Sequence, residues 1–590
     1  MGGRALGVAV GATALASLLT ILAVGIAFAE TAPARPQQTD LAAVELPEPA
    51  SGEADRTPAP AVLPAEGDPV FPDPAAEGDD EPPVGPAAAP AGEQGRDPAD
   101  ASAPPAKTPP PVAEPPPQHP TVAEIRLKLQ DPALRKGAAA DDLAALEAFY
   151  GEHAGPPLWI TTVGFNSKAQ ALLAEIQGAA EWGLPAEAFD LPPAADLPST
   201  TEAQAVHEIK LAFAVLKYAR FARGGRVSPS RISNLFDQKS NLLDPKEVLR
   251  EVAARPSPGA YLASLHPKHD QFERLRQELG KAVAAAKARG RHPSADGLVQ
   301  RIVVNMERWR WMPLELGAYH VWNNVPAFTT RVMKHGKSIS IGKAIVGQVK
   351  YATPIFSADM RSIVFNPEWV VPETIKTEDL QPRLRQMVRG VPDVSVLREN
   401  RLSVSYQGKP VNATTIDWNR ANIHAYTFTQ APGPSNVLGT LKFNFPNRHA
   451  VYMHDTVQPA LFKKTVRIFS HGCIRVHEPE RLAALLLAED KGWLPEQVKS
   501  MLVRGRNSAV PLSRPVPVHL TYFTLAYDGV GKLQTYADIY GLDGKMAQAL
   551  FGKSELLAVE AAPKQTERPQ RRRAANRGMG GPYLPGLFGN

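Results

Sequence analysis

The chain has 590 residues, including 58 prolines and a single cysteine, and its formal net charge is +5 at pH 7. Its length allows more than one domain. A lone cysteine excludes an intrachain disulfide and any zinc site built on several sulfurs.

The first 29 residues predict an export signal. One charge, Arg4, is followed by an uninterrupted apolar or small run over 5–29, and Ala27-Phe28-Ala29 resembles a signal-peptidase site. The run is also long enough to span a bilayer. Residues 1–29 are therefore either a cleaved signal peptide or a membrane anchor. Both alternatives predict an exported chain, for which we expect no nucleic-acid partner.

A proline-rich, acidic segment follows over 30–120. Residues 31–120 hold 24 of the 58 prolines and 16 acidic against 4 basic side chains. This composition lacks the aliphatic residues that close a core, so it predicts a disordered linker. Removing its net charge of −12 from the overall +5 leaves +17 for the remainder, which suits a polyanionic environment. Part of that excess lies in a basic tail over 553–590, which is also predicted to be disordered.

Residues 121–300 predict a helical domain, because apolar residues recur three and four positions apart between breaks rich in Gly and Pro. From residue 301 the period changes to that of strands, and His335-Gly336-Lys337 separates two such runs as a hairpin turn would. We expect a multi-domain α+β chain that is helical first and β-rich afterwards.

An insertion is predicted within the β-rich domain, over 367–438. Residues 372–389 have a helical pattern, and residues 402–406 have the pattern of a strand. A connection this long inside a compact sheet is usually functional.

The chemistry centres on Cys473. Gly472 removes a side chain where a reacting carbonyl would approach. The histidines at 454, 471 and 477 and the guanidinium of Arg475 offer bases and positive charge, which would lower the pKa of the thiol. These features favour a reactive sulfur in an electropositive pocket.

Two short runs, 450–453 and 465–469, read as buried strands that end just before His454 and the cysteine loop. If these strands are sheet neighbours, the imidazole and the thiol meet. A thiol, a base within hydrogen-bond reach and a group that orients the base form the general arrangement for covalent acyl transfer.

Two other interpretations stay open at this point. A lone cysteine is commonly packed as a small apolar side chain. A zinc site from His454, His471 and Cys473 would lack a fourth ligand.

Two segments together resemble the signature of the L,D-transpeptidases, in particular the large Gram-negative kind with a YkuD-type catalytic domain. They are Tyr452-Met453-His454-Asp455-Thr456 and 467–476, which contains Ser470-His471-Gly472-Cys473-Ile474-Arg475. The blocks 301–311 and 538–541 look like the same family. The resemblance covers about the second half of the chain well and extends more weakly from about residue 140.

The resemblance implies a scaffold domain over 121–300 and a catalytic domain over 301–545. Within the latter, 367–438 would be a substrate-capping subdomain, a lid over the active site. Large relatives often carry a small peptidoglycan-binding module, whose pattern we do not find here.

The resemblance also implies a periplasmic enzyme that needs no cofactor and no metal. Cys473 would attack the L-to-D bond of a peptidoglycan tetrapeptide stem, release D-Ala and pass the acyl group to an amine. His454 would be the base, oriented by the backbone carbonyl of Asp455. The remaining expected site residues are Tyr452, Gly472 and His471 for the oxyanion and pocket, and Ser470, Arg475 and Asp455 for substrate contact.

The acyl acceptor stays open. It is the diaminopimelate side chain of another stem, which would give a 3-3 crosslink, or an outer-membrane protein or lipoprotein, or water. Carbapenems are expected to acylate Cys473, and residues 5–29 are a candidate inner-membrane anchor. A non-enzymatic protein that tethers the cell wall is the alternative from another class.

Overall fold

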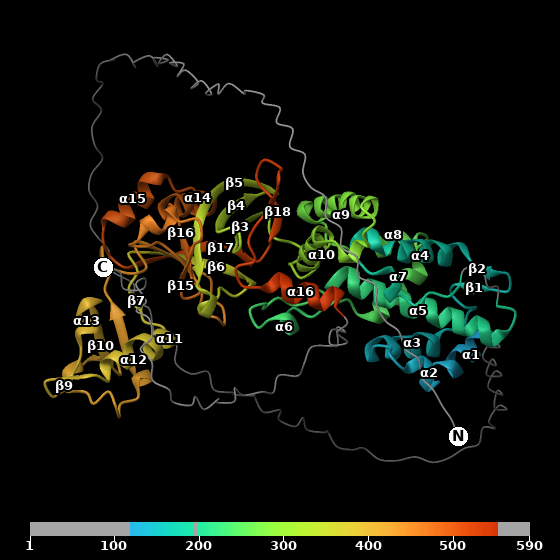
Figure 1. The fold of residues 1–590 in the computed structure, drawn as a ribbon, viewed down its shortest axis with the longest axis horizontal. Helices are drawn as coiled ribbons and strands as arrows, with labels where there is room; N and C mark the ends of the chain where they lie inside the picture. The colour runs from blue at the N-terminus through green and yellow to red at the C-terminus, as the bar shows by residue number, and fades with distance from the viewer. Residues whose placement is uncertain (1–118, 194–197, 553–590) are drawn as a thin grey trace, which may run out of the picture. The chain divides into compact units, whose positions relative to one another are not determined.

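The computed structural model describes residues 119–193 and 198–552 (Figure 1). The predicted export signal (1–29), almost all of the predicted linker (30–120) and the predicted basic tail (553–590) lie outside these ranges. The chain divides into two units, 1–108 and 109–590, and everything below concerns the described residues of the second. Every helix within the described ranges is too short or too polar to cross a membrane.

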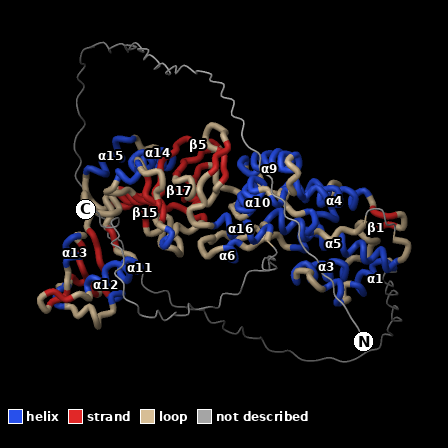
Figure 2. Tube along the Cα trace, viewed as in Figure 1, coloured by secondary structure: helices blue, strands red, loops and turns tan. Residues whose placement is uncertain are grey.

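Helices make up nearly all of the regular structure from residue 120 to residue 310 (Figure 2). Helix α5 (Thr201–Gly224) is central, because α1, α3, α4, α7 and α8 all contact it. It begins at a side-chain cap, where Thr200 Oγ1 accepts from the N–H of Ala203 at 3.1 Å. The other elements are α1 (Pro120–Lys128), α2 (Pro132–Arg135), α3 (Ala140–Glu152), β1 (Ile160–Thr161), β2 (Gly164–Phe165), α4 (Ser167–Gln177), α6 (Pro229–Ile232), α7 (Pro245–Ala254), α8 (Pro258–Ser264), α9 (Asp270–Ala288) and α10 (Gly297–Arg310).

A buried carboxylate joins three parts of this helical region. Glu208 on α5 is fully buried and accepts from Tyr150 Oη on α3 at 2.8 Å. It also accepts from the backbone N–H groups of Leu158, Trp159 and Ile160 ahead of and within β1. These donors satisfy carboxyl oxygens that would otherwise be costly to bury.

Residues 301–310 are helical, as the second part of α10, although the sequence analysis placed them at the start of a strand-like region. Every side chain from Ile302 to Arg310 is buried. The β-branched run Ile302-Val303-Val304 has the composition of a strand, and tertiary packing overrides that local preference.

The second half of the chain is built on a nine-stranded sheet in the order β15-β5-β16-β14-β13-β6-β17-β3-β4. Strand β4 also pairs with β5, so eight of these strands close into a ring. The turn between β4 and β5 has positive φ at His335 and Gly336, as the hairpin signal predicted. The strands are β3 (Tyr319–Asn324), β4 (Thr329–Lys334), β5 (Lys337–Gly347), β6 (Phe356–Phe365), β13 (Leu441–Asn444), β14 (Met453–His454), β15 (Ile468–Ser470), β16 (Ile474–Val476) and β17 (Ser508–Thr521).

Helices complete this half of the chain. Leu482, Leu486 and Leu487 of α14 (Pro479–Lys491) pack with Val498 of α15 (Pro495–Val503) into the same apolar core as the sheet. A small hairpin follows, from β18 (Leu525–Tyr527) and β19 (Leu533–Thr535). Helix α16 (Leu542–Phe551) then packs on α10, where Arg308 Nη1 donates to Asp543 Oδ1 at 2.7 Å.

A small subdomain with its own core is inserted between β6 and β13. Its sheet has the order β11-β10-β12-β7, and Trp418 and Phe428 are buried in its core. We call it the lid subdomain. Its elements are β7 (Trp369–Val370), α11 (Glu373–Ile375), the π-helix η5 (Lys376–Leu380), α12 (Gln381–Leu384), β8 (Met387–Val388), β9 (Val391–Pro392), α13 (Ser395–Glu399), β10 (Leu402–Tyr406), β11 (Lys409–Pro410) and β12 (Tyr426–Gln430).

The predicted limits of the insertion, 367 and 438, fall in the segments that flank this subdomain. The predicted limits at 300 and 545 fall inside α10 and α16. These domain limits stay predictions.

Candidate active site

Parallel pairing of β14 with β16 places the cysteine loop beside the histidine strand. Met453 is paired with Ile474, and His454 with Arg475. The N–H of Ile474 donates to the backbone carbonyl of Tyr452 at 3.1 Å. Cys473 therefore lies next to Tyr452 across the two strands.

The strand pairing predicted from the sequence is wrong. The run before the cysteine loop forms β15, which pairs with β5 and not with β14. The strand that joins the cysteine to the histidine is β16, which follows Cys473. Its three residues are too short a run to stand out in the sequence.

The cysteine loop is held by its own side chains. Ser470 is buried, and its Oγ donates to the carbonyl of Cys473 at 2.5 Å while accepting from the N–H of Gly472 at 3.1 Å. Thr353 Oγ1 donates to the carbonyl of Gly472 at 2.9 Å. Ser470 thus holds the loop together from within, and its contact with substrate stays a prediction.

Gly472 is needed for its backbone conformation. Its φ is +110°, a backbone conformation that residues with a side chain rarely adopt. Space is not the constraint, because a Cβ there would meet no atom closer than 3.6 Å. Its N–H is already engaged with Ser470, so it is not free to bind an oxyanion. The N–H of Cys473 makes no hydrogen bond within the described part of the chain, and it is the available backbone donor.

The thiol of Cys473 is half-buried and protonated at rest. Burial raises its pKa from 9.0 to about 11, although the main chain and hydroxyl of Tyr452 and the cations of Lys442 and Arg475 all act to lower it. The sequence analysis expected the nearby positive charge to lower the thiol pKa. That expectation is wrong because the cost of removing the thiolate from water exceeds the attraction of the cations.

The imidazole of His454 is neutral. It is buried, and burial together with Arg475 and Lys442 lowers its pKa to about 3. The two cations flank it in register, because Lys442 on β13 and Arg475 on β16 are both paired with His454. The backbone carbonyls of Asp455 and Leu438 oppose this shift, but Nδ1 makes no hydrogen bond of good geometry within the described residues.

Lys442 was missed by the sequence analysis. Its Nζ lies 4.3 Å from the ring centroid of Tyr452, and its charge acts on Cys473. The only signal was a lysine in the alternating run 441–445, and its importance depends on the register of β13 with β14.

Two predicted substrate contacts are engaged within the protein. Asp455 Oδ2 accepts from the N–H and Oγ1 of Thr440 at 2.9 and 3.0 Å, and its Oδ1 accepts from the N–H of Thr456 at 2.7 Å. Arg475 is buried, and its Nη1 donates to Gln458 Oε1 at 3.1 Å. The Asp455 carboxylate holds two loops together. Arg475 keeps an unpartnered Nε and supplies charge near the sulfur.

His471 lies where the lid subdomain meets the cysteine loop. Its ring stacks on that of Tyr351, with 4.0 Å between centroids, and its Nε2 lies 3.6 Å from Asp379 Oδ2 of the lid. Glu378, the preceding lid residue, accepts from Tyr351 Oη and Lys350 Nζ. Burial and Arg475 lower the pKa of His471 to about 4. The sequence did not single out Tyr351, Glu378 or Asp379.

The profile of the family described as "L,D-transpeptidase catalytic domain" (YkuD) matches residues 318–499. Residues 318–499 form an L,D-transpeptidase catalytic domain. The profile of the family described as "Scaffold domain" matches residues 144–279. The family resemblance and the multi-domain α+β fold, helical and then β-rich, are thereby confirmed.

A protein of Haemophilus influenzae described as "Putative L,D-transpeptidase" is 32% identical to this chain over 250 residues, which are 42% of this chain and 48% of that protein. The match thus spans about half the length of that relative. The crystal structure of Mycobacterium tuberculosis L,D-transpeptidase 1 is 14% identical, covers 35% of this chain and 61% of its own, and has a TM-score of 0.14. That TM-score is too low to inform the fold of this chain.

The L,D-transpeptidase domain offers no ready zinc site in its described part, because no three His, Cys, Asp or Glu side chains across the described ranges are placed to share a metal ion. The zinc interpretation of His454, His471 and Cys473 therefore finds no ligand set. What the domain does present is a half-buried thiol, a neutral imidazole one strand away, a tyrosine hydroxyl and two buried or half-buried cations.

Proposed function

We propose that this protein is a periplasmic L,D-transpeptidase that acts on peptidoglycan through a thioester on Cys473. Cys473 attacks the L-to-D bond that precedes the terminal D-Ala of a tetrapeptide stem, and D-Ala leaves. The acyl group then passes to the diaminopimelate side-chain amine of another stem and forms a 3-3 crosslink. One observation supports this proposal: within the family-matched domain, β14 pairs with β16 so that His454 lies opposite Arg475, and Cys473 lies next to Tyr452, which precedes His454 by two residues.

The proton on sulfur is the first obstacle to this reaction. The thiol holds it with a pKa of about 11, whereas His454 accepts it with a pKa of about 3. A free thiolate–imidazolium pair is therefore not the resting state. Transfer to His454 must accompany attack on the substrate carbonyl, and the proton then goes to the amine of the departing D-Ala.

The cations of Lys442 and Arg475 serve the first half of this step, because they attract the negative charge that develops on sulfur as its proton leaves. As the S–C bond forms, negative charge moves from sulfur to the carbonyl oxygen. At its new position the charge is stabilised by hydrogen-bond donors aimed at the carbonyl oxygen. The donors proposed for the oxyanion are the N–H of Cys473 and the hydroxyl of Tyr452, and losing one such donor typically costs ~10²–10³ in rate.

The acceptor decides which reaction follows the thioester. Water would make the protein an L,D-carboxypeptidase, and a protein amine would make it an enzyme that attaches outer-membrane proteins or lipoproteins to the wall. We take the diaminopimelate amine as the acceptor. The same thiol is the proposed site of carbapenem acylation, and anchoring through residues 5–29 belongs to the same proposal.

Mass spectrometry of the full chain after incubation with purified tetrapeptide muropeptides tests the proposal. Crosslinked dimers are expected, and tripeptide products alone would indicate the carboxypeptidase. A carbapenem added separately should leave an adduct on Cys473. The Cys473→Ala chain should lose all products and the adduct while keeping its thermal unfolding midpoint. Activity retained in that variant would return the protein to the class of non-enzymatic wall tethers.

A further inference from the structure

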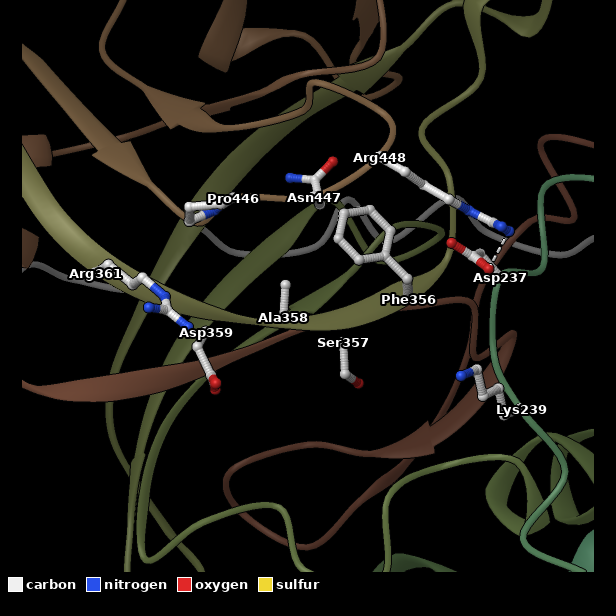
Figure 3. A pocket seen from close by; sticks show the side chains of 10 residues that line it. All are labelled: Asp237, Lys239, Phe356, Ser357, Ala358, Asp359, Arg361, Pro446, Asn447 and Arg448. Atoms are coloured by element: carbon white, nitrogen blue, oxygen red, sulfur yellow. Dashed lines mark hydrogen bonds and ion pairs between the residues drawn. The ribbon is translucent and has the colours of Figure 1, made fainter. Parts of the chain in front are cut away.

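A second hollow lies apart from the active site and shares no lining residue with the cysteine loop. Its volume is about 640 Å³, and Figure 3 shows Phe356 and Ala358 on one side of β6 with Ser357 and Asp359 on the other. Three segments line it: a loop after α6 with Asp237 and Lys239, the first half of β6, and residues 446–448 ahead of β14. Its volume is in the range of small-molecule and peptide sites.

The walls of this cavity are fixed to one another. The N–H of Asp237 donates to the carbonyl of Ile355 at 2.8 Å, which joins the loop after α6 to the residue before β6. Asn447 Nδ2 donates to the carbonyls of Phe445 and Val451 at 2.6 and 2.7 Å. Its Oδ1 accepts from the N–H groups of His449 and Val451. A ligand would therefore meet a preformed wall and lose little free energy in ordering it.

The charges of the cavity are only partly paired. Asp237 accepts from Arg448 and from His449 Nε2, so its carboxylate is neutralised (Figure 3). Lys239, Arg361 and Asp359 are exposed and make no hydrogen bond or ion pair through their side chains with other described residues. The lining thus includes two cations and one carboxylate that are free with respect to the described residues, and Asp359 lies on the side of β6 opposite to Phe356 and Ala358.

The complementary ligand has at least two carboxylates and one amine. We propose that this cavity binds a peptidoglycan stem peptide other than the one that reacts at Cys473. The free carboxylates of the stem would lie at Lys239 and Arg361, and the free amine of its diaminopimelate would lie at Asp359. This inference rests on the proposed function, which supplies stems as the surroundings of the enzyme.

A stem whose amine is held at Asp359 cannot at the same time attack a thioester. The cavity is therefore an anchoring site, which holds the enzyme on the wall through a stem that does not react. Such a site gives the protein affinity for the wall without the separate peptidoglycan-binding module whose pattern is missing from the sequence.

Binding of a disaccharide-tripeptide muropeptide to the full chain tests the inference. This probe lacks the terminal D-Ala, and the Cys473→Ala background removes the nucleophile, so nothing is consumed during the titration. The Lys239→Glu/Arg361→Glu variant should weaken binding about tenfold, because two exposed attractions become repulsions. Lys499→Glu/Arg506→Glu is the matched control, since both side chains are exposed, unpaired and outside the cavity. It should change binding less than twofold.

The neutral variant Lys239→Gln/Arg361→Gln should lie between the parent and the charge reversal, and thermal unfolding should show that all variants are folded. The site would be overturned if the cavity variant and the control lost muropeptide affinity equally, or if neither variant lost any. Equal binding of glycan chains stripped of stems would also overturn it. Release of D-Ala from tetrapeptides by the chain with Cys473 intact is measured separately. If this chain releases no D-Ala but still binds the tripeptide, the result counts against the proposed function and not against the peptide site.

Discussion

The pKa of the Cys473 thiol can be measured without ambiguity, because no other cysteine in the chain competes for an alkylating reagent. Alkylation by iodoacetamide proceeds through the thiolate, so its rate follows the thiolate fraction. Burial raises this pKa from 9.0 to about 11. At pH 8 the thiolate fraction is then about 10⁻³ in place of about 10⁻¹, a loss of about a hundredfold.

The assay compares the native chain with the same chain unfolded in urea, between pH 6 and pH 10. In the native chain, the rate should rise about tenfold per pH unit over this whole range, because the pH stays below the thiol pKa. In the unfolded chain, the rate should level off near pH 9. Restricted access to a half-buried sulfur would lower the native rate equally at every pH, so the shape of the profile isolates the pKa.

The Lys442→Met variant provides a second test of the same pKa, because it removes a cation that lowers the pKa of the thiol. Native alkylation at pH 8 should become slower still, whereas Lys499→Met on α15, which lies outside the site, should leave it unchanged. A native profile that levels off near pH 7 or below would refute the reasoning. It would mean that Cys473 and His454 form a thiolate–imidazolium pair at rest.

Three further outcomes are expected. Gly472→Ala should cost about 1–3 kcal/mol of stability in thermal unfolding and most of the D-Ala release, because the strained φ of +110° persists even though a Cβ would fit. Glu378→Gln should raise KM for tetrapeptide a fewfold with a smaller effect on kcat, because it weakens the contact of the lid with Tyr351; an unchanged KM would exclude that contact from substrate binding. Burial raises the pKa of Glu208 from 4.5 to about 7, so the folded state keeps a proton that the unfolded state loses. Stability should therefore fall by about 3 kcal/mol as pH rises from 4.5 to 7, and Glu208→Gln should flatten that slope in denaturant titrations.

The sequence alone was sufficient to predict features that depend on a short stretch of neighbouring residues. The segments 452–456 and 467–476 predict the thiol and the imidazole by residue type and spacing, and both segments lie within the family-matched residues 318–499. The order of a helical region followed by a β-rich one was also predictable, because each element has its own period along the chain. Residues 301–310 were the exception, since the β-branched run Ile302-Val303-Val304 of α10 has the composition of a strand.

Only the tertiary structure decided how the site is assembled. The histidine strand pairs with the three residues after Cys473, and its other neighbour brings in Lys442. The same packing shields the sulfur and the imidazole from water. It raises the pKa of the thiol against the attraction of the nearby cations, and it lowers the pKa of the imidazole in the same direction as those cations. A sequence shows which charges are near one another along the chain. Desolvation depends on every segment that covers a group, and those segments come together only in the fold.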